Sequence, residues 1–113
     1  MKARNKTLNF SKEYREAILS GRKVSTIRLR TSLRAGDKAL IVAGGEKLGI
    51  AKITSVRRKR ISNLTRKDAV MDGFKSLNEL IRALERHYGK LKPSTEVSVI
   101  HFQLTQKRER RSR

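Results

Sequence analysis

One stretch decides the fold of this chain: Gly21-Arg22-Lys23-Val24-Ser25-Thr26-Ile27-Arg28. It follows a short amphipathic segment and continues into alternating polar and apolar residues, which predicts a glycine turn that leads into a β-strand. In that strand Thr26, Arg28 and Arg30 share one face, and Lys23 lies in the turn beside them. Ammonium and guanidinium groups donate charge-assisted hydrogen bonds, so the cluster suits an anionic or strongly polar ligand. The alternative is a basic hairpin without a ligand.

The charge of the chain indicates the class of partner. Its 113 residues are enough for one domain with a modest core, and they include 29 Lys and Arg against 10 Asp and Glu, a formal net charge of +19. Basic side chains displace counterions from phosphates, so we expect a polyanionic partner, with nucleic acid as the leading candidate. A membrane surface is the lesser alternative, and no apolar run approaches the roughly twenty residues of a membrane-spanning helix.

The residue types that the chain lacks exclude several kinds of site. It contains no cysteine and only two histidines, which excludes disulfides and thiolate sites and argues against zinc. We therefore expect no metal and no cofactor. The N-terminal sequence MKARNKTLNF has no apolar region typical of a secretory signal, and we expect a cytoplasmic protein.

Hydrophobic periodicity predicts the order of the elements. Strands are expected over residues 5–10, 24–30, 39–43, 48–56 and 95–104, with a tight turn at Gly44-Gly45 between the third and fourth. Helices are expected after Ser11 up to Gly21, over residues 62–69, and from Ser76 to Gly89. Thr65 with Asp68, and Ser76 with Glu79, have the spacing of a capping box. The last helix carries an apolar stripe that we assign to the core, formed by Leu77, Leu80, Ile81, Leu84 and Tyr88.

Two strongly basic segments lie outside the opening stretch. The run Arg57-Arg58-Lys59-Arg60 extends the fourth strand and is predicted to contact phosphates, with a solvated strand end as the alternative. We assign residues 1–104 to the folded domain and residues 105–113 to a basic arm that is disordered alone and orders on nucleic acid. The cations of that arm are Lys107, Arg108, Arg110, Arg111 and Arg113.

The opening stretch resembles the motif of the ASCH family, small PUA-like proteins. That family carries G-x-K-x-x-[ET]-x-R after its first helix, and Gly21, Lys23, Thr26 and Arg28 fill the four places. The similarity extends to the helix over residues 14–19, the turn at 35–37, a helical insertion over 64–80 and a closing strand over 97–102. It implies an α+β fold, a mostly antiparallel PUA-like β-barrel of about five to six strands with two to three peripheral helices.

The resemblance implies RNA binding in translation, ribosome association or RNA processing and modification. The expected partner is a structured RNA such as ribosomal or transfer RNA, within a ribonucleoprotein assembly, and no membrane. Lys23, Arg28 and Arg30 would hold a phosphate or the edge of a base in the cleft between the Lys23 turn and the Asp72 region. We assign Tyr14, Phe74 and Tyr88 to the core, so recognition is expected to depend on charge and shape rather than on stacking.

The resemblance also implies an enzymatic alternative, an amidohydrolase acting on N4-acylated cytidine. Its lysine and threonine match Lys23 and Thr26, and the place of its glutamate falls on Asp72, which is one methylene shorter. A lysine with a lowered pKa would take the proton from the threonine hydroxyl, which then attacks the acyl carbon. Asp72-Gly73 can instead be a turn between two helices. Ribonuclease activity is a third option without paired histidines to support it, and we predict His101 to be a hydrogen-bonded interior or rim residue rather than a base.

Overall fold

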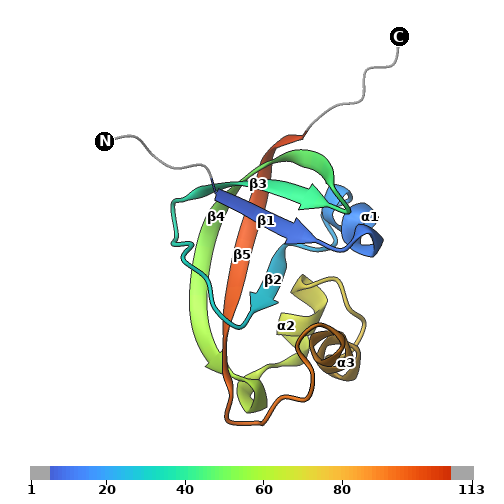
Figure 1. The fold of residues 1–113 in the computed structure, drawn as a ribbon, viewed down its shortest axis with the longest axis vertical. Coiled ribbons are helices and arrows are strands. Elements are labelled where there is room, and N and C mark those ends of the chain that lie inside the picture. The colour runs from blue at the N-terminus through green and yellow to red at the C-terminus, as the bar shows by residue number, and fades with distance from the viewer. Residues whose placement is uncertain (1–5, 108–113) are drawn as a thin grey trace.

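The sheet and its helices follow the predicted order. The computed structural model of the chain describes residues 6–107. Its five strands are β1 (Lys6–Phe10), β2 (Ser25–Arg28), β3 (Lys38–Ala43), β4 (Glu46–Arg60) and β5 (Glu96–Lys107). The helices are α1 (Arg15–Leu19), α2 (Arg66–Met71) and α3 (Leu77–Tyr88), with short 3-10 turns η1 (Lys12–Tyr14) and η2 (Ile61–Asn63). These elements confirm the predicted α+β class (Figure 1).

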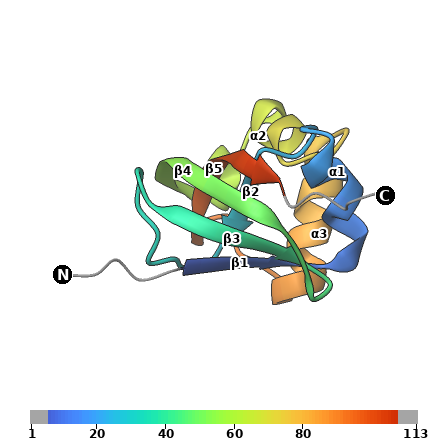
Figure 2. The same cartoon turned by 90° about the horizontal axis from the view of Figure 1, so that it is seen from above.

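The strands form one mixed sheet in the order β1-β3-β4-β5-β2. β1 runs parallel to β3, and every other neighbouring pair is antiparallel, as predicted for the bulk of the sheet. The sheet curls into a half-barrel, so its two edge strands, β1 and β2, face each other across an opening without pairing through their backbones (Figures 1 and 2). Side chains from the ends of both edge strands line one pocket.

A β-bulge in β4 decides which way the basic run points. Ile53 pairs with Phe102 and Ser55 pairs with His101, so Thr54 is an extra residue without its own partner. An inserted residue shifts the alternation of side chains, and residues beyond it change face. Ser55 consequently faces the outside of the half-barrel together with His101, whereas Val56 faces inward opposite Ile100.

Two apolar cores lie on the two faces of the sheet. The inner core fills the half-barrel with side chains from β1, β3, β4, β5 and α1, including Ile18, Ile41, Ile53, Ile100 and Phe102. The outer core lies between the β2–β5 face and the helices α2 and α3, including Ile27, Ala69, Leu84, Val97 and Val99. The split confirms the predicted alternation along the last strand. In Figure 1, α2 and α3 lie beside the lower part of β2, below β1 and β3.

Several element ends differ from the predicted ones. The first helix is divided into η1 and α1, and the segment predicted as a helix over 62–69 is divided into η2 and α2. Thr65 and Asp68 form the predicted capping box at the start of α2. At α3, Ser76 accepts a hydrogen bond from the backbone of Glu79, but the Glu79 carboxylate accepts from the backbone of Lys75, so the second box is incomplete. The Glu79 carboxylate thus accepts from the backbone N–H one residue before that of Ser76, the donor that a complete capping box would use.

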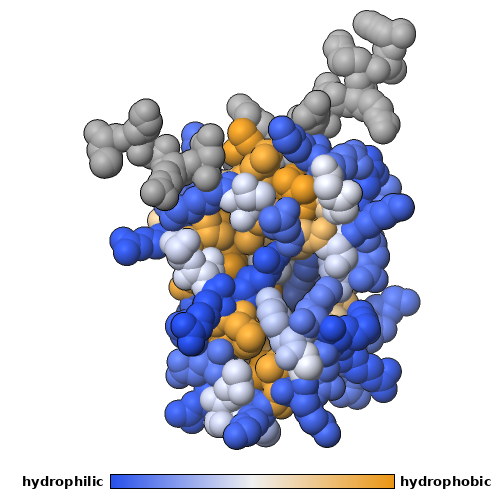
Figure 3. All heavy atoms as spheres, viewed as in Figure 1, coloured by the Kyte–Doolittle hydropathy of each residue, from blue (hydrophilic) through white to orange (hydrophobic). Residues whose placement is uncertain are grey.

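Only the first part of the segment predicted as a basic arm, residues 105–113, lies within the described chain. β5 continues to Lys107, three residues beyond the predicted strand end, while Arg108, Arg110, Arg111 and Arg113 lie outside the described residues. Within residues 6–107, no helix is long and apolar enough to cross a membrane. The face shown in Figure 3 is covered mostly by hydrophilic side chains, as a net charge of +19 requires.

Candidate functional site

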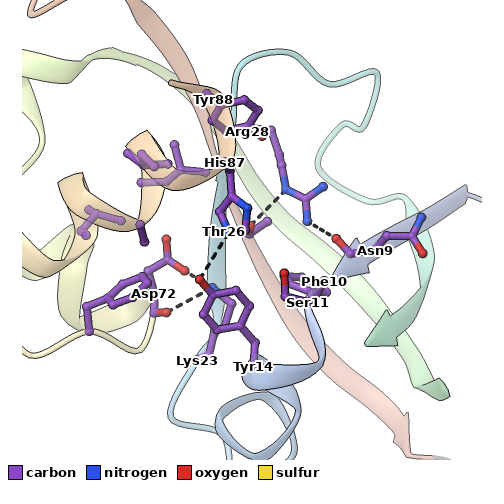
Figure 4. A pocket seen from close by; sticks show the side chains of 15 residues that line it. Asn9, Phe10, Ser11, Tyr14, Lys23, Thr26, Arg28, Asp72, His87 and Tyr88 are labelled. Carbon is purple, nitrogen blue, oxygen red and sulfur yellow. Dashed lines mark hydrogen bonds and ion pairs between the residues drawn. The ribbon is translucent and has the colours of Figure 1, made fainter. Parts of the chain in front are cut away.

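A pocket of about 420 Å³ occupies the opening between β1 and β2. Asn9 and Phe10 at the end of β1 form one side, and Thr26 and Arg28 of β2 form the other. The helices close the remaining walls through residues of η1, the α2–α3 connection and α3, as Figure 4 shows. Its volume falls within the usual range of about 300–1,000 Å³ for small-molecule sites. The pocket exists because the two edge strands do not pair.

A buried ion pair lies at the base of the pocket. The Lys23 ammonium contacts the Asp72 carboxylate and donates a hydrogen bond to the Asp72 carbonyl oxygen over 3.1 Å (Figure 4). Both side chains are only 4% exposed. The rings of Tyr14, Phe10 and Phe74 surround the ammonium, with centroids 4.9, 5.5 and 5.9 Å from Nζ. The charge of Lys23 is therefore balanced by a carboxylate and by the negative faces of three rings.

Burial sets the protonation behaviour of this pair. Removal from water lowers the pKa of Lys23, although the charge and hydrogen bond of Asp72 oppose the shift. Removal from water raises the pKa of Asp72 from 3.8 to about 6, against the opposing effect of Lys23. Both shifts disfavour the charged forms, because desolvation outweighs the attraction between the partners. Asp72 therefore keeps its proton to a higher pH than an exposed aspartate does.

Gly73 allows the short Asp72 side chain to reach Lys23. Its φ of +93° lies in the region that favours glycine, and a Cβ atom at this position would lie 3.2 Å from the Cβ of Lys23. The end of α2 therefore packs directly against the Lys23 backbone segment. Asp72-Gly73 forms the turn that follows α2. The turn that was the alternative role for Asp72-Gly73 is present, and Asp72 also contacts Lys23.

Arg28 spans the opening between the edge strands. Its Nη2 donates to the carbonyl oxygen of Asn9 over 2.8 Å, and its Nε donates to the Thr26 hydroxyl over 3.2 Å. The guanidinium carbon lies 5.1 Å from the centroid of the Phe10 ring. Burial lowers the pKa of Arg28. In the part of the chain that the structure describes, none of the ion pairs involves Arg28. Arg28 is therefore the pocket's cation without a carboxylate partner.

Comparisons with known proteins identify the family and the fold of the chain. The model of the ASCH domain family matches residues 3–106. The chain belongs to the ASCH domain family. ASCH domains are PUA-like and often bind RNA. The G-x-K-x-x-T-x-R motif of this ASCH chain lies at the pocket. Gly21 takes a φ of +83° at the turn, and Lys23, Thr26 and Arg28 all line the pocket.

Solved structures share the fold at low sequence identity. A protein from Enterococcus faecalis V583 has a TM-score of 0.76 at 16% identity, covering 100% of this chain and 88% of that chain. An ASCH domain from Lactobacillus crispatus has a TM-score of 0.64 at 19% identity, covering 88% and 82%. A point variant of an ASCH protein from Zymomonas mobilis has a TM-score of 0.67 at 18% identity, covering 93% and 73%. No curated protein matches the sequence. These similarities establish the PUA-like ASCH fold alone.

The aromatic wall of the ASCH pocket was missed by the sequence analysis. Tyr14 and Phe74 pack against the cores, but both also line the pocket and contact each other edge to face, with centroids 6.2 Å apart. Tyr88 is 36% exposed and lies outside both cores, so its assignment to the core is wrong. Exposed His87 also lines the pocket, with its Nε2 3.4 Å from the Tyr14 hydroxyl. Helical spacing predicts a face for these side chains and does not reveal what lies opposite.

The other predicted basic residues lie away from the pocket. Arg30 is exposed and does not line it. Arg58 donates to the carbonyl oxygen of Leu29 and to the Ser98 hydroxyl, both over 2.9 Å, while Lys59 pairs with Asp68 at 2.7 Å. Arg57 and Arg60 are exposed. Only part of the basic run is thus available to a partner.

His101 differs from its predicted role in one respect. It is half-buried, as predicted for a rim position, but its Nε2 is buried without a hydrogen-bond partner among the described residues. Within residues 6–107, no three or more His, Cys, Asp or Glu residues are grouped so that they could hold a metal ion.

Proposed function

We propose that this ASCH domain binds structured RNA and that the pocket receives one unpaired base. The proposal keeps the setting implied by the resemblance, which is translation, ribosome association or RNA processing, with ribosomal or transfer RNA as the expected partner. The observation that carries it is the pocket itself, in which aromatic side chains and the directional donors of Arg28 lie together on a protein of charge +19. Sequence-specific recognition of RNA commonly uses splayed-out bases that stack on aromatic rings or guanidinium planes.

The pairing of Lys23 favours a base over a phosphate as the occupant of the pocket. The Lys23 ammonium is already neutralised by Asp72, so the base of the pocket offers little free positive charge. Planar surfaces and fixed hydrogen-bonding groups remain, which suit a heteroaromatic ring with polar edges. Phosphates would then contact exposed cations around the pocket rather than Lys23. In this proposal Arg28 binds a base edge, and Tyr88 provides an accessible ring.

Binding of an RNA hairpin with an unpaired loop tests this function. We expect Arg28→Gln to weaken binding of the hairpin by about tenfold or more, since a directional contact to a base edge contributes about 1–3 kcal/mol. Arg30→Gln is the matched control, because Arg30 is exposed two residues away and outside the pocket. A blunt duplex without unpaired bases should bind both variants equally. Equal losses for Arg28→Gln and Arg30→Gln would rule out base recognition in the pocket.

The identity of the RNA requires recovery from cells. The protein would be isolated at low and at high salt and the co-purifying RNA sequenced, with Arg28→Gln in parallel. Recovery of ribosomal or transfer RNA that depends on Arg28 would support the proposed setting, and absence of any RNA at low salt would contradict it.

A second function is favoured by one specific arrangement, the amidohydrolase reaction on N4-acylated cytidine. Lys23, Thr26 and Asp72 line one pocket, and Asp72 contacts Lys23. Arg28 donates to the Thr26 hydroxyl, which would stabilise negative charge on that oxygen. Thr26 Oγ1 would bond to the acyl carbon as neutral Lys23 takes its proton, and the amide C–N bond would break with proton transfer to the leaving amine. Water would then hydrolyse the acyl ester of Thr26.

Release of acetate from N4-acetylcytidine distinguishes the two functions. Thr26→Val removes the hydroxyl at similar volume, so it should abolish hydrolysis, and Thr26→Ser should retain part of it. If Thr26→Val releases acetate at the wild-type rate, Thr26 is not the nucleophile. The ribonuclease option gains no support here, because His87 and Asp72 are the only histidine and carboxylate among the described residues that line the pocket.

A further inference from the structure

The outer face of the sheet carries a row of polar residues away from the pocket. Strand register places Ser25 of β2 opposite His101 of β5, and His101 opposite Ser55 of β4. Residues directly opposite each other in a sheet point to the same side. The row therefore crosses three strands on the face that α2 covers at β2 and β5. Ser25 is fully buried, whereas Ser55 and His101 are half-buried.

Cations extend this row along β4. Arg57 lies opposite Val99 and Lys59 opposite Val97, and both valines belong to the outer core beneath the helices. The helices cover these valines of β5 but leave Arg57 on neighbouring β4 exposed. Asp68, Arg57, Lys67 and Lys59 lie near enough for their charges to shift the pKa of His101. We call the set Ser55, Arg57, Lys59, Lys67 and His101 the outer strip.

The outer strip has more positive charge than its own structure uses. Its nearby carboxylate, Asp68, accepts from Lys59 and from the backbone of Thr65. Arg57 and Lys67 are exposed, and neither forms an ion pair in the part of the chain that the structure describes. Lys67 also lies in the first turn of α2, where the helix dipole disfavours a cation.

Unpartnered polar atoms lie at the centre of the same row. Among the described residues, the Ser25 hydroxyl and His101 Nε2 are buried without a hydrogen-bond partner. Buried polar groups are nearly always satisfied, so each of these atoms calls for a partner. Burial lowers the pKa of His101, and the cations of Arg57, Lys67 and Lys59 add to this effect while Asp68 opposes it. Burial and these cations therefore disfavour the charged form of the His101 ring.

We propose that the outer strip binds the phosphate backbone of RNA, as a contact separate from the pocket. Alternate residues of a strand are about 6.6 Å apart, so Ser55, Arg57 and Lys59 present polar groups at regular intervals along one line. Lys59 is paired with Asp68, so the free cations are Arg57 on this line and Lys67 of α2. Exposed cations beside a line of polar groups suit consecutive phosphates, and backbone contacts of this kind position a nucleic acid without reading its sequence. The inference rests on the proposed function in taking RNA as the polyanion.

The two contacts lie on different faces of the sheet. Thr26 and Arg28 reach the pocket from positions opposite Ile100 and Ser98, one residue out of phase with the row through His101. A ligand that occupies both contacts extends beyond the nucleotide in the pocket, and we take it to be a folded RNA with one segment at each contact. The pocket would recognise an unpaired base, and the outer strip would hold a backbone segment beside α2.

The two histidines make the two contacts separately observable. His87 lines the pocket and His101 lies in the outer strip, and the sequence has no other histidine. In NMR spectra of the imidazole protons, free cytidine should shift only His87, and the RNA hairpin with a folded stem should shift both. A phosphate beside His101 should also raise its pKa in the complex. A hairpin that shifts His87 alone overturns the outer strip and leaves the pocket intact, while a hairpin that shifts neither overturns both.

Charge variants test the same contact through salt dependence. Arg57→Gln/Lys67→Gln should lower the slope of log affinity against log salt by about 1.4–1.8, because each lost phosphate contact removes about 0.7–0.9. The His101 shift should disappear and the His87 shift should remain. Lys90→Gln/Lys92→Gln removes the same charge from two exposed residues between α3 and β5 and should leave the slope nearly unchanged. An equal loss of slope in both double variants overturns the proposal.

Discussion

The pocket and the outer strip contain similar side chains under opposite physical conditions. In the pocket, Lys23 is 4% exposed, paired with Asp72 and surrounded by three rings. In the outer strip, Arg57 and Lys67 are exposed. Burial makes a charge costly unless it is paired, whereas exposure leaves it available to a partner and sensitive to salt. The basic residues behind the net charge of +19 therefore do not form a single binding surface. Stability measurements should report on the buried cation, and salt titrations of RNA binding on the exposed ones.

The largest expected effect comes from breaking the buried pair. Asp72→Ala leaves the Lys23 ammonium buried without its counter-charge, which should lower the free energy of unfolding by about 3–5 kcal/mol. Chemical denaturation measures this loss. The double variant Lys23→Met/Asp72→Leu removes both charges at similar volume and should regain most of the stability. If the double variant is as unstable as Asp72→Ala, packing rather than the unpaired charge explains the loss.

The next effect is a dependence of stability on pH. Between about pH 4 and 6 the folded protein keeps a proton on Asp72 that the unfolded chain has released, because the pKa is raised from 3.8 to about 6. The contribution of Asp72 to stability therefore decreases as pH rises through this window, by at most about 3 kcal/mol at about 1.4 kcal/mol per unit. A carbon-13 NMR titration should show a midpoint near 6 for Asp72. Asp37 is the internal control, since the hydrogen bond from Lys6 lowers its pKa.

A smaller effect isolates the close approach of α2 to Lys23. Gly73→Ala places a methyl group 3.2 Å from the Lys23 Cβ at a φ of +93°. Gly36→Ala meets a similar φ of +97° but has no atom within 4 Å of the new methyl group. Both should lose about 1–2 kcal/mol from the backbone conformation, and Gly73→Ala should lose more. Thermal unfolding of the two variants gives the difference, and equal losses would show that the approach to Lys23 is not tight.

The smallest effects distinguish two neighbouring arginines. Arg58→Gln removes hydrogen bonds to Leu29 and Ser98 and should lower stability by about 1 kcal/mol. Arg57→Gln removes an exposed side chain and should change stability by less than about 0.5 kcal/mol. It should instead lower the salt slope of RNA binding by about 0.7–0.9. Denaturation and salt titration of both variants check this; a stability loss confined to Arg57→Gln would reverse the assignment of faces.

Local signals in the sequence predicted the elements well where a short-range mechanism exists. The Thr65–Asp68 capping box forms as predicted because its donors and acceptors are three residues apart. The alternation of Val97 and Val99 with Ile100 and Phe102 correctly predicts two cores, since strand side chains alternate between faces. The ASCH motif predicted three pocket residues, Lys23, Thr26 and Arg28.

Signals of longer range were less complete. Arg30 continues the face of Thr26 and Arg28 in the sequence pattern, but β2 ends at Arg28 and Arg30 is exposed away from the pocket. Tyr88 continues the apolar stripe of α3, yet it is 36% exposed and lines the pocket instead of the core. In both cases the residue continues the predicted strand or helix periodicity, but its tertiary surroundings are not those of the preceding residues on the same face.

The sequence by itself determined the fold class, the excess of positive charge and the glycine turn that carries Lys23, because these depend on composition and on residues a few positions apart. The tertiary structure alone decided how the charges are divided. It brings Lys23 into contact with Asp72, 49 residues away. It also leaves β1 and β2 without backbone pairing to each other, and a pocket forms between them. The extra residue Thr54 puts Arg57 on the face of Val99 and Arg58 on the opposite face with Ser98. No local period encodes these choices, since each depends on which distant strand or helix packs alongside.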